Sequence, residues 1–252
     1  MPYARALAFA LLLAVSILFV SPVQWLARRF DWPLHRRIQV GFCRAACAVI
    51  GVRIDARGAT LPGRAPRLLV SNHVSWSDII VLAALHPLTF LAKSEVSSWP
   101  VLGFLARLQG TVFVERGNRK AIPLVNAALT RELAAGRDLV IFAEGTSSDG
   151  TRVLEFKSAH FPGGEAMAEA DLAPVALRYC DSRGASVDVG WYGDMTFLPH
   201  LWRLMKRDDL VCRVAFGDLV APQGHDRKAL AAALHEKVSG LLEGMRAADE
   251  RV

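Results

Sequence analysis

The chain has 252 residues, of which 52% are hydrophobic and 21% are charged, and its formal net charge is +6 at pH 7. It is long enough for one sizeable core and too uniform in composition to divide into two folded domains. The positive charge favours acidic partners such as anionic membrane lipids or an acidic carrier protein, and because no zinc-finger or RNA-recognition motif accompanies it, we expect no nucleic-acid partner.

The first predicted element is an apolar helical segment from Ala6 to Val23, which contains no charged residue. It is just long enough to span a bilayer, and an interfacial Trp25 and basic Arg28 and Arg29 follow it. A cleavable signal peptide is the alternative, but the basic residues on the exit side favour a retained anchor. We expect this anchor to span the inner (cytoplasmic) membrane or to lie in one leaflet, with the rest of the chain facing the cytoplasm.

A second apolar stretch, from Ile38 to Val52, is interrupted by Arg44 and is short for a membrane span. We expect an amphipathic helix that lies on the membrane or on the body of the protein. A loop rich in proline and glycine follows from Gly58 to Pro66. These features divide the chain into an N-terminal membrane anchor with its amphipathic helix, residues 1–57, and a globular domain, residues 58–252.

Strand and helix patterns alternate after this loop. Helices are predicted to start near Ser75 or Ser77, either of which could be the N-cap, and to cover Pro100–Leu108 and Arg119–Leu133. Strands are predicted to end at Asn72 and to cover Leu88–Ala92, Gly110–Val114 and Asp138–Ala143. The alternation predicts an α/β fold, with a mostly parallel sheet flanked by helices and the chemistry at the strand ends.

The C-terminal part adds strands at Pro174–Tyr179, Val187–Tyr192 and Leu210–Phe216. Between them, Phe197–Arg207 mixes large apolar and basic residues at helical spacing, which fits either a membrane-surface helix or core packing. Asp226 is predicted to cap a final helix. The apolar stripe of that helix is assigned to the core: Leu230, Leu234, Val238, Leu241 and Met245.

The cysteines and histidines predict no disulfide and no metal site. No Cys-x-x-Cys spacing occurs among Cys43, Cys47, Cys180 and Cys212. Reduced core cysteines suit a protein that faces the cytosol. The seven histidines contain no His-Glu-x-x-His motif, so we expect no metal cofactor.

A polar segment between two apolar runs, residues 71–78, contains an imidazole and a carboxylate. On one continuous helix His73 and Asp78 would point away from each other, so they can meet only if His73 lies before the first turn. In that geometry Asp78 accepts a hydrogen bond from one ring nitrogen, and the other nitrogen can take a proton from a hydroxyl. The alternative is a structural histidine beside an aspartate at a helix start.

Two further polar clusters lie at predicted strand ends: Gly-Thr-Val-Phe-Val-Glu-Arg at residues 110–116 and Phe-Ala-Glu-Gly-Thr-Ser-Ser at residues 142–148. Together with the His-x-x-x-x-Asp pair, they resemble the motifs of the glycerolipid acyltransferase family, whose members acylate glycerol phosphate, lysophosphatidate and related lysolipids. Leu172–Leu177 resembles the fourth motif of that family. The resemblance covers roughly residues 65–180, and the hydrophobic N-terminus is also similar to that of membrane-bound members.

The resemblance implies a membrane-associated O-acyltransferase. His73 would deprotonate the acceptor hydroxyl, Asp78 would orient the imidazole, and the alcohol would attack an acyl thioester of acyl carrier protein or coenzyme A without a cofactor. Arg116 would bind the headgroup, and Lys93 and Lys157 are further candidates for phosphate contact. The other implied substrate-binding residues are Gly110, Phe113, Glu144, Gly145 and Thr146. An ion pair at Arg116 and a polar turn at residues 144–146 are the structural alternatives.

The chain departs from the family pattern at two places. Ala143 and Ser147 stand where the family often has the proline and arginine of Pro-Glu-Gly-Thr-Arg, and Phe156-Lys157-Ser158-Ala159 lacks a usual glycine. The leading acceptor is 1-acylglycerol-3-phosphate (lysophosphatidate), which would be acylated to phosphatidate. Because a second cation is missing, unless Arg152 or Lys157 replaces it, a phosphorus-free acceptor such as a lyso-ornithine lipid is the alternative.

Two other classes of function compete with acyl transfer. A serine hydrolase would use Ser71, Ser75 or Ser147, but the sequence contains no Gly-x-Ser-x-Gly motif. A non-catalytic membrane-binding module would not need the intact His73, Asp78 and Glu144.

Overall fold

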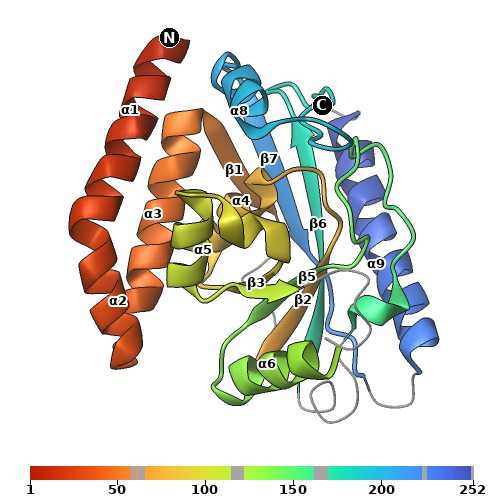
Figure 1. The fold of residues 1–252 in the computed structure, drawn as a ribbon. Helices are drawn as coiled ribbons and strands as arrows, with labels where there is room; N and C mark the ends of the chain where they lie inside the picture. Colours follow the sequence, from red (N-terminus) through yellow and green to blue (C-terminus); the bar gives the residue numbers. More distant parts are fainter. Residues whose placement is uncertain (58–60, 62–65, 115–121, 162–169, 223–225, 251–252) are drawn as a thin grey trace.

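A seven-stranded sheet forms the centre of the molecule (Figure 1). The structure is a computed structural model, and it describes the whole chain except residues 58–60, 62–65, 115–121, 162–169, 223–225 and 251–252. The spatial order of the strands is β1-β7-β6-β2-β5-β3-β4, and every neighbouring pair is parallel except β6 and β7. Their bounds are β1 Val52–Arg57, β2 Arg67–Ser71, β3 Thr89–Lys93, β4 Val112–Val114, β5 Leu139–Phe142, β6 Asp171–Cys180 and β7 Leu210–Phe216. The predicted α/β class with a mostly parallel sheet is therefore confirmed.

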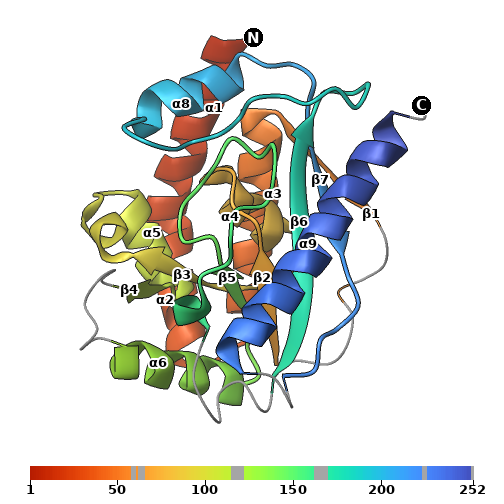
Figure 2. The same ribbon diagram turned by 90° about the vertical axis from the view of Figure 1, so that its right-hand side faces the viewer.

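Helices cover both faces of the sheet. The described α-helices are α1 Pro2–Val15, α2 Ser21–Arg29, α3 Leu34–Ile50, α4 Ser77–Leu85, α5 Leu102–Gln109, α6 Ile122–Ala134, α8 Phe197–Met205 and α9 Arg227–Asp249. One apolar cluster joins α3, α4 and α8 to one face, and a second joins α6 and α9 to the other. Figure 2 shows α9 lying along the face of the sheet opposite α3.

The central strand β2 shows why both faces need cover. Successive side chains of a strand point to opposite faces, so Leu69 packs in the first apolar cluster while Leu68 and Val70 pack in the second. All five residues of β2 are buried. A continuous apolar run of this kind is typical of a parallel strand with helices on both sides.

Several predicted boundaries are wrong. The strand β1 was not predicted, although its alternating apolar and charged residues carry a period-two pattern; it pairs with β7 and forms one edge of the sheet. Val187–Tyr192 was predicted as a strand, but it forms no named strand; the backbone N–H of Trp191 instead donates to the carbonyl of Val74, at 3.0 Å. The sheet thus includes residues that the sequence prediction placed in the N-terminal segment.

Helix ends also differ from the predictions. The residue that precedes α4 is Trp76, with no side-chain cap, so neither Ser75 nor Ser77 is the N-cap. The helix α5 starts at Leu102, after the predicted Pro100. Asp226 does cap α9, since its carboxylate accepts from the backbone N–H groups of residues 228 and 229. The buried stripe of α9 contains Leu242, whereas Leu241 is only partly buried.

The N-terminal helix runs from Pro2 to Arg29 through a π-helical segment at Ser16–Val20, and it is long and apolar enough to cross a membrane, since an 18-residue window within it has a mean hydropathy of 2.5. It lies alongside α3 (Figure 1). Near its start, Arg5 donates to the carbonyl oxygens of Met205, the last residue of α8, and of Arg207 just beyond it. The side of the helix that faces away from the body exposes large apolar side chains: Leu7, Leu11, Leu18, Phe19 and Trp25.

The segment Phe197–Arg207, which fitted either a surface helix or the core, mostly packs inward. Leu201, Leu204 and Met205 of α8 belong to the first apolar cluster, while Leu198 is exposed. His200 is also buried, and it accepts a hydrogen bond from the indole of Trp76 at 3.0 Å. The helix α8 therefore packs in the core and also contacts Trp76, the residue that precedes α4.

Candidate active site

His73 and Asp78 meet just beyond the carboxyl end of β2. Because β2 ends at Ser71 and α4 begins at Ser77, His73 lies in the connection before the first helical turn. The Nδ1 atom of His73 lies 2.8 Å from Oδ2 of Asp78. An ionised carboxylate has no proton to donate, so Nδ1 carries the proton of this hydrogen bond and Nε2 is left as the basic nitrogen.

The carboxylate of Asp78 is completely buried and is held from several directions. Its Oδ2 also accepts from the backbone N–H groups of Val74 and Ser75, at 2.7 and 3.0 Å. Its Oδ1 accepts from the hydroxyl of Tyr179 at 2.8 Å. These bonds fix the position of the carboxylate and thereby the plane of the imidazole.

The ring of His73 is held on its face as well as its edge. It stacks on Phe142 at the end of β5, with ring centroids 4.0 Å apart and an angle of 17° between the planes. The side chain of His73 keeps 15% of its surface exposed, and its Nε2 has no hydrogen-bond partner among the described residues. A hydroxyl that approaches this nitrogen would meet an oriented base.

Glu144 lies two residues after the end of β5 and is almost completely buried. Its Oε1 accepts from the backbone N–H of Leu154 at 3.1 Å. Burial raises the pKa of Glu144 to about 8, with a smaller contribution from the negative charge of Asp78, while nearby backbone N–H groups of Leu154 and His73 oppose the rise. The carboxyl is therefore mostly protonated at neutral pH, and it adds little negative charge beside His73.

The Glu-Gly-Thr turn is attached to the His73 loop. Gly145 has a φ of 71°, which favours glycine. Thr146 is exposed, and Ser147 donates its hydroxyl to the carbonyl of Trp191. The backbone N–H of Ser148 donates to the carbonyl of His73 at 2.9 Å. This loop, residues 144–148, therefore lies beside His73 and under the segment that was predicted to be a strand.

The other predicted site residues are more dispersed. Lys93 ends β3 and pairs with Glu95 at 2.8 Å, and Phe113 lies in β4 opposite Ala92. Lys157 is exposed, although its backbone N–H donates to the carbonyl of Ala143 after β5. Gly110, with a φ of 81°, follows the last residue of α5 and lies beside Arg28. It precedes β4, so it is at the opposite end of that strand from Val114. Arg116 lies outside the described residues.

Tyr179 is the site residue that the sequence prediction missed. It lies on β6 and is buried. Because its phenol proton is donated to Asp78, its oxygen accepts a second hydrogen bond from the hydroxyl of Ser77, at 2.8 Å. Burial holds the pKa of Tyr179 well above its ordinary value, and Asp78 raises it further, so the phenol keeps the proton that it donates. A tyrosine inside a buried strand is a signal that a polar partner exists, but the sequence does not say which one.

The chain is similar to known proteins over most of its length. The model of the Acyltransferase family matches residues 53–177. The chain is 39% identical to the lyso-ornithine lipid O-acyltransferase of Brucella abortus, over 94% of this chain and 93% of that protein. It is 36% identical to the 1-acyl-sn-glycerol-3-phosphate acyltransferase of Neisseria meningitidis, over 69% of each chain. The crystal structure of the 1-acyl-sn-glycerophosphate acyltransferase PlsC from Thermotoga maritima has the same fold, with a TM-score of 0.67 at 20% identity, and the match covers 96% of this chain and 95% of that one.

Proposed function

This chain belongs to the acyltransferase family, and we propose that it transfers a fatty acyl group to the free hydroxyl of a lyso-ornithine lipid. The observation that carries this choice of acceptor is the extent of the similarity. The lyso-ornithine lipid O-acyltransferase of Brucella abortus matches over 94% of this chain. The 1-acyl-sn-glycerol-3-phosphate acyltransferases of Neisseria meningitidis and Neisseria gonorrhoeae match over 69% and 82% of this chain, at 36% and 33% identity.

In the proposed reaction, Nε2 of His73 takes the proton of the acceptor hydroxyl, and the oxygen attacks the carbonyl carbon of an acyl thioester. The bond between carbon and sulfur then breaks, and the imidazolium returns its proton to the leaving thiolate. Asp78 stabilises the imidazolium during this step. The thioester is supplied by acyl carrier protein or coenzyme A, and the acidic surface of a carrier protein suits the net charge of +6.

The charge available for the headgroup supports a phosphorus-free acceptor. A phosphomonoester carries nearly two negative charges and is held best by two or more cations. Ser147 occupies the position of a second arginine in the family pattern, and its hydroxyl is engaged by the carbonyl of Trp191. One remaining arginine at position 116 is enough for the single carboxylate of an ornithine headgroup, and the mostly protonated Glu144 would not repel it.

We place this reaction at the inner membrane, with the sheet on the cytoplasmic side. The helix from Pro2 to Arg29 exposes apolar side chains along one side and is attached to the body near both ends, by Arg5 and by Arg28. A helix that is attached to the body near both ends suits burial in one leaflet beside the body. A lysolipid in the same leaflet could then reach His73 without leaving the bilayer.

A second acceptor, 1-acylglycerol-3-phosphate, is supported by the 36% identity to the Neisseria meningitidis enzyme. The test is a side-by-side assay of the purified protein with both acceptors and one acyl carrier protein donor. We expect a clear preference for the lyso-ornithine lipid, and we expect Ser147→Arg to improve the use of lysophosphatidate. A preference of the unaltered protein for lysophosphatidate would refute the proposed acceptor but not the acyl transfer.

A further inference from the structure

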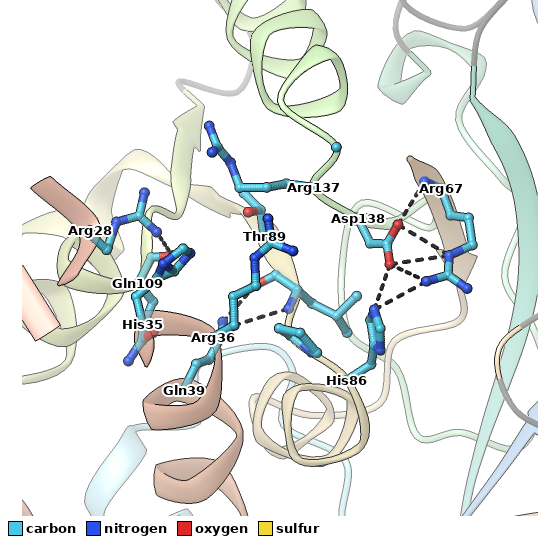
Figure 3. A pocket seen from close by; sticks show the side chains of 13 residues that line it. Arg28, His35, Arg36, Gln39, Arg67, His86, Thr89, Gln109, Arg137 and Asp138 are labelled. Carbon is cyan, nitrogen blue, oxygen red and sulfur yellow. Dashed lines mark hydrogen bonds and ion pairs between the residues drawn. The ribbon is translucent and has the colours of Figure 1, made fainter. Parts of the chain in front are cut away.

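A pocket lies at the amino ends of the central strands, whereas His73 lies beyond the carboxyl end of β2. Figure 3 shows this pocket, which has a volume of about 150 Å³. Arg67 and Thr89, the first residues of β2 and β3, are part of its wall, whereas His73 follows the last residue of β2. Because five residues of a strand extend over about 16 Å, the pocket is a separate site.

One half of the pocket wall is a closed ion-pair network. Asp138 lies 2.6 Å from the guanidinium of Arg67 and 2.7 Å from the ring of His86. The same carboxylate also accepts from the backbone N–H of Arg67 at 2.8 Å. This network, on the right in Figure 3, is structural, and its charges offset each other.

The other half of the wall contains three arginines from three helices or loops. Arg28 of α2 donates to the carbonyl of Gln109 at 2.7 Å. Arg137, after α6, donates to Glu132 at 2.7 Å. The side chain of Arg36, on α3, forms no hydrogen bond or ion pair with the described residues, so its guanidinium is available to a ligand.

The balance of charge selects the kind of ligand. The pocket wall and the carboxylates that pair with it contain four guanidinium groups against three carboxylates: Arg28, Arg36, Arg67 and Arg137 against Asp31, Glu132 and Asp138. Glu132 also pairs at 3.7 Å with Arg131, which is exposed outside the pocket wall. The positive charges of three of these arginines also act on His35, whose pKa is lowered by burial and by Arg28, Arg36 and Arg137. An excess of one positive charge suits a monoanion such as a phosphodiester better than a dianion.

Aromatic side chains beside the pocket indicate its position relative to a bilayer. The exposed Trp25, Phe30 and Trp32 surround the end of the apolar helix, and Phe30 stacks on Trp32 at 5.6 Å. Exposed tryptophans at the end of an apolar helix are typical of the headgroup level of a membrane. Arg28 lies in the last turn of the same helix, so the pocket mouth is expected where lipid phosphates are found.

We propose that this pocket binds a phosphodiester monoanion, supplied by the headgroup of an anionic phospholipid, with Arg36 as the main contact. The lipid arm of the proposal rests on the proposed membrane association, but it is independent of the acyl acceptor. A bound headgroup would add a specific attachment point to the apolar contact made by the N-terminal helix. The pocket would thus hold the α2–α3 corner at the membrane surface.

The test compares Arg36→Gln with the matched control Arg37→Gln. Both arginines are exposed on α3 and lack partners among the described residues, but only Arg36 is part of the pocket wall. The full chain is titrated with phosphatidylcholine vesicles that contain about one quarter phosphatidylglycerol, and with pure phosphatidylcholine vesicles. We expect Arg36→Gln to weaken the phosphatidylglycerol-dependent binding about tenfold or more, and Arg37→Gln to weaken it less than about fivefold.

A second measurement separates the pocket from the membrane. In a nonionic detergent, soluble glycerophosphoglycerol should raise the unfolding temperature of the unaltered protein and of Arg37→Gln, but not that of Arg36→Gln. Stabilisation by this soluble diester without any vesicle effect would keep the phosphodiester site but exclude the lipid as its source. Equal losses for the two variants in both measurements would overturn the proposal, because non-specific surface charge would then explain the binding.

Discussion

At the scale of single residues, Asp78 connects the candidate base to the core. Its carboxylate joins His73, two backbone N–H groups and the phenol of Tyr179 within 3.0 Å. Such a buried and fully paired carboxylate can orient a histidine without having to reorganise during the reaction. The hydrogen bonds connect Tyr179 to Asp78 and Asp78 to His73. Each of these residues should therefore affect acyl transfer according to its distance from the proton that moves.

We expect a graded loss of activity along this chain. His73→Ala should reduce acyl transfer by at least about 10²–10⁴-fold, which is the usual contribution of a general base. Asp78→Asn should reduce it strongly, because the amide can favour the wrong tautomer and cannot balance the imidazolium. Tyr179→Phe should have a smaller effect. The measurement is kcat of each purified variant over a range of pH.

The control for this series is the folded state of each variant, measured by far-UV circular dichroism and thermal unfolding. Because Tyr179 acts through Asp78, its loss should change the pH profile of kcat as well as its size. Near-normal turnover by folded His73→Ala at neutral pH would show that the general-base assignment is wrong. An unchanged pH profile in Tyr179→Phe would restrict Tyr179 to a structural role.

At the scale of elements, the N-terminal helix packs against the core with one side and exposes apolar side chains on the other, so substitutions on the two sides should have different effects. Phe9 is only 8% exposed and belongs to the first apolar cluster, whereas Phe19 is 69% exposed. The inner side of the helix thus belongs to the core of the protein, and the outer side is free to contact lipid. A simple deletion of the helix would disturb both functions at once.

The matched pair Phe9→Ala and Phe19→Ala tests this division. Removing a buried phenylalanine side chain costs about 3 kcal/mol or more of stability, so Phe9→Ala should lower the unfolding temperature clearly. Phe19→Ala should leave the unfolding temperature nearly unchanged and should weaken binding to phosphatidylcholine vesicles. Thermal unfolding in detergent and vesicle flotation measure the two effects. Loss of stability in Phe19→Ala alone would contradict the assignment of the two sides.

At the scale of the whole molecule, the parallel sheet separates two kinds of site. The carboxyl ends of β2 and β5 lead to His73 and Glu144, and the amino ends of β2 and β3 lead to the arginine pocket. Loops at the carboxyl edge of a parallel sheet converge, which is why active sites are common there. At this edge the fold brings Glu144, which is mostly protonated at neutral pH, close to the base His73.

The raised pKa of Glu144 should make the stability of the molecule depend on pH. Its pKa is raised from an ordinary value of 4.5 to about 8, so between these values the folded state binds a proton that the unfolded state releases. The favourable contribution of the Glu144 carboxyl to the free energy of unfolding is complete below pH 4.5 and is lost as the pH rises through 8. Between these values the free energy of unfolding falls by up to about 1.4 kcal/mol per pH unit. The difference in unfolding free energy between the unaltered protein and Glu144→Gln should therefore shift against the unaltered protein with rising pH. A difference that is independent of pH would contradict the raised pKa.

The sequence by itself determined the fold class and the core of the candidate active site. Alternating apolar segments specify strands and helices because periodicity is a local property. His73 and Asp78 are five positions apart, so a strand end and a helix start were sufficient to predict their contact, which the distance of 2.8 Å confirms.

Only the tertiary structure decided which distant groups complete that site. Tyr179 reaches Asp78 from 101 positions away, and the ring of Phe142 reaches His73 from another strand. The same packing made Val187–Tyr192, an expected strand, a segment that lies over the site, and it placed four arginines around one pocket. The physical reason is that local patterns record which side of an element is buried, whereas the partner across the interface depends on how the whole chain packs.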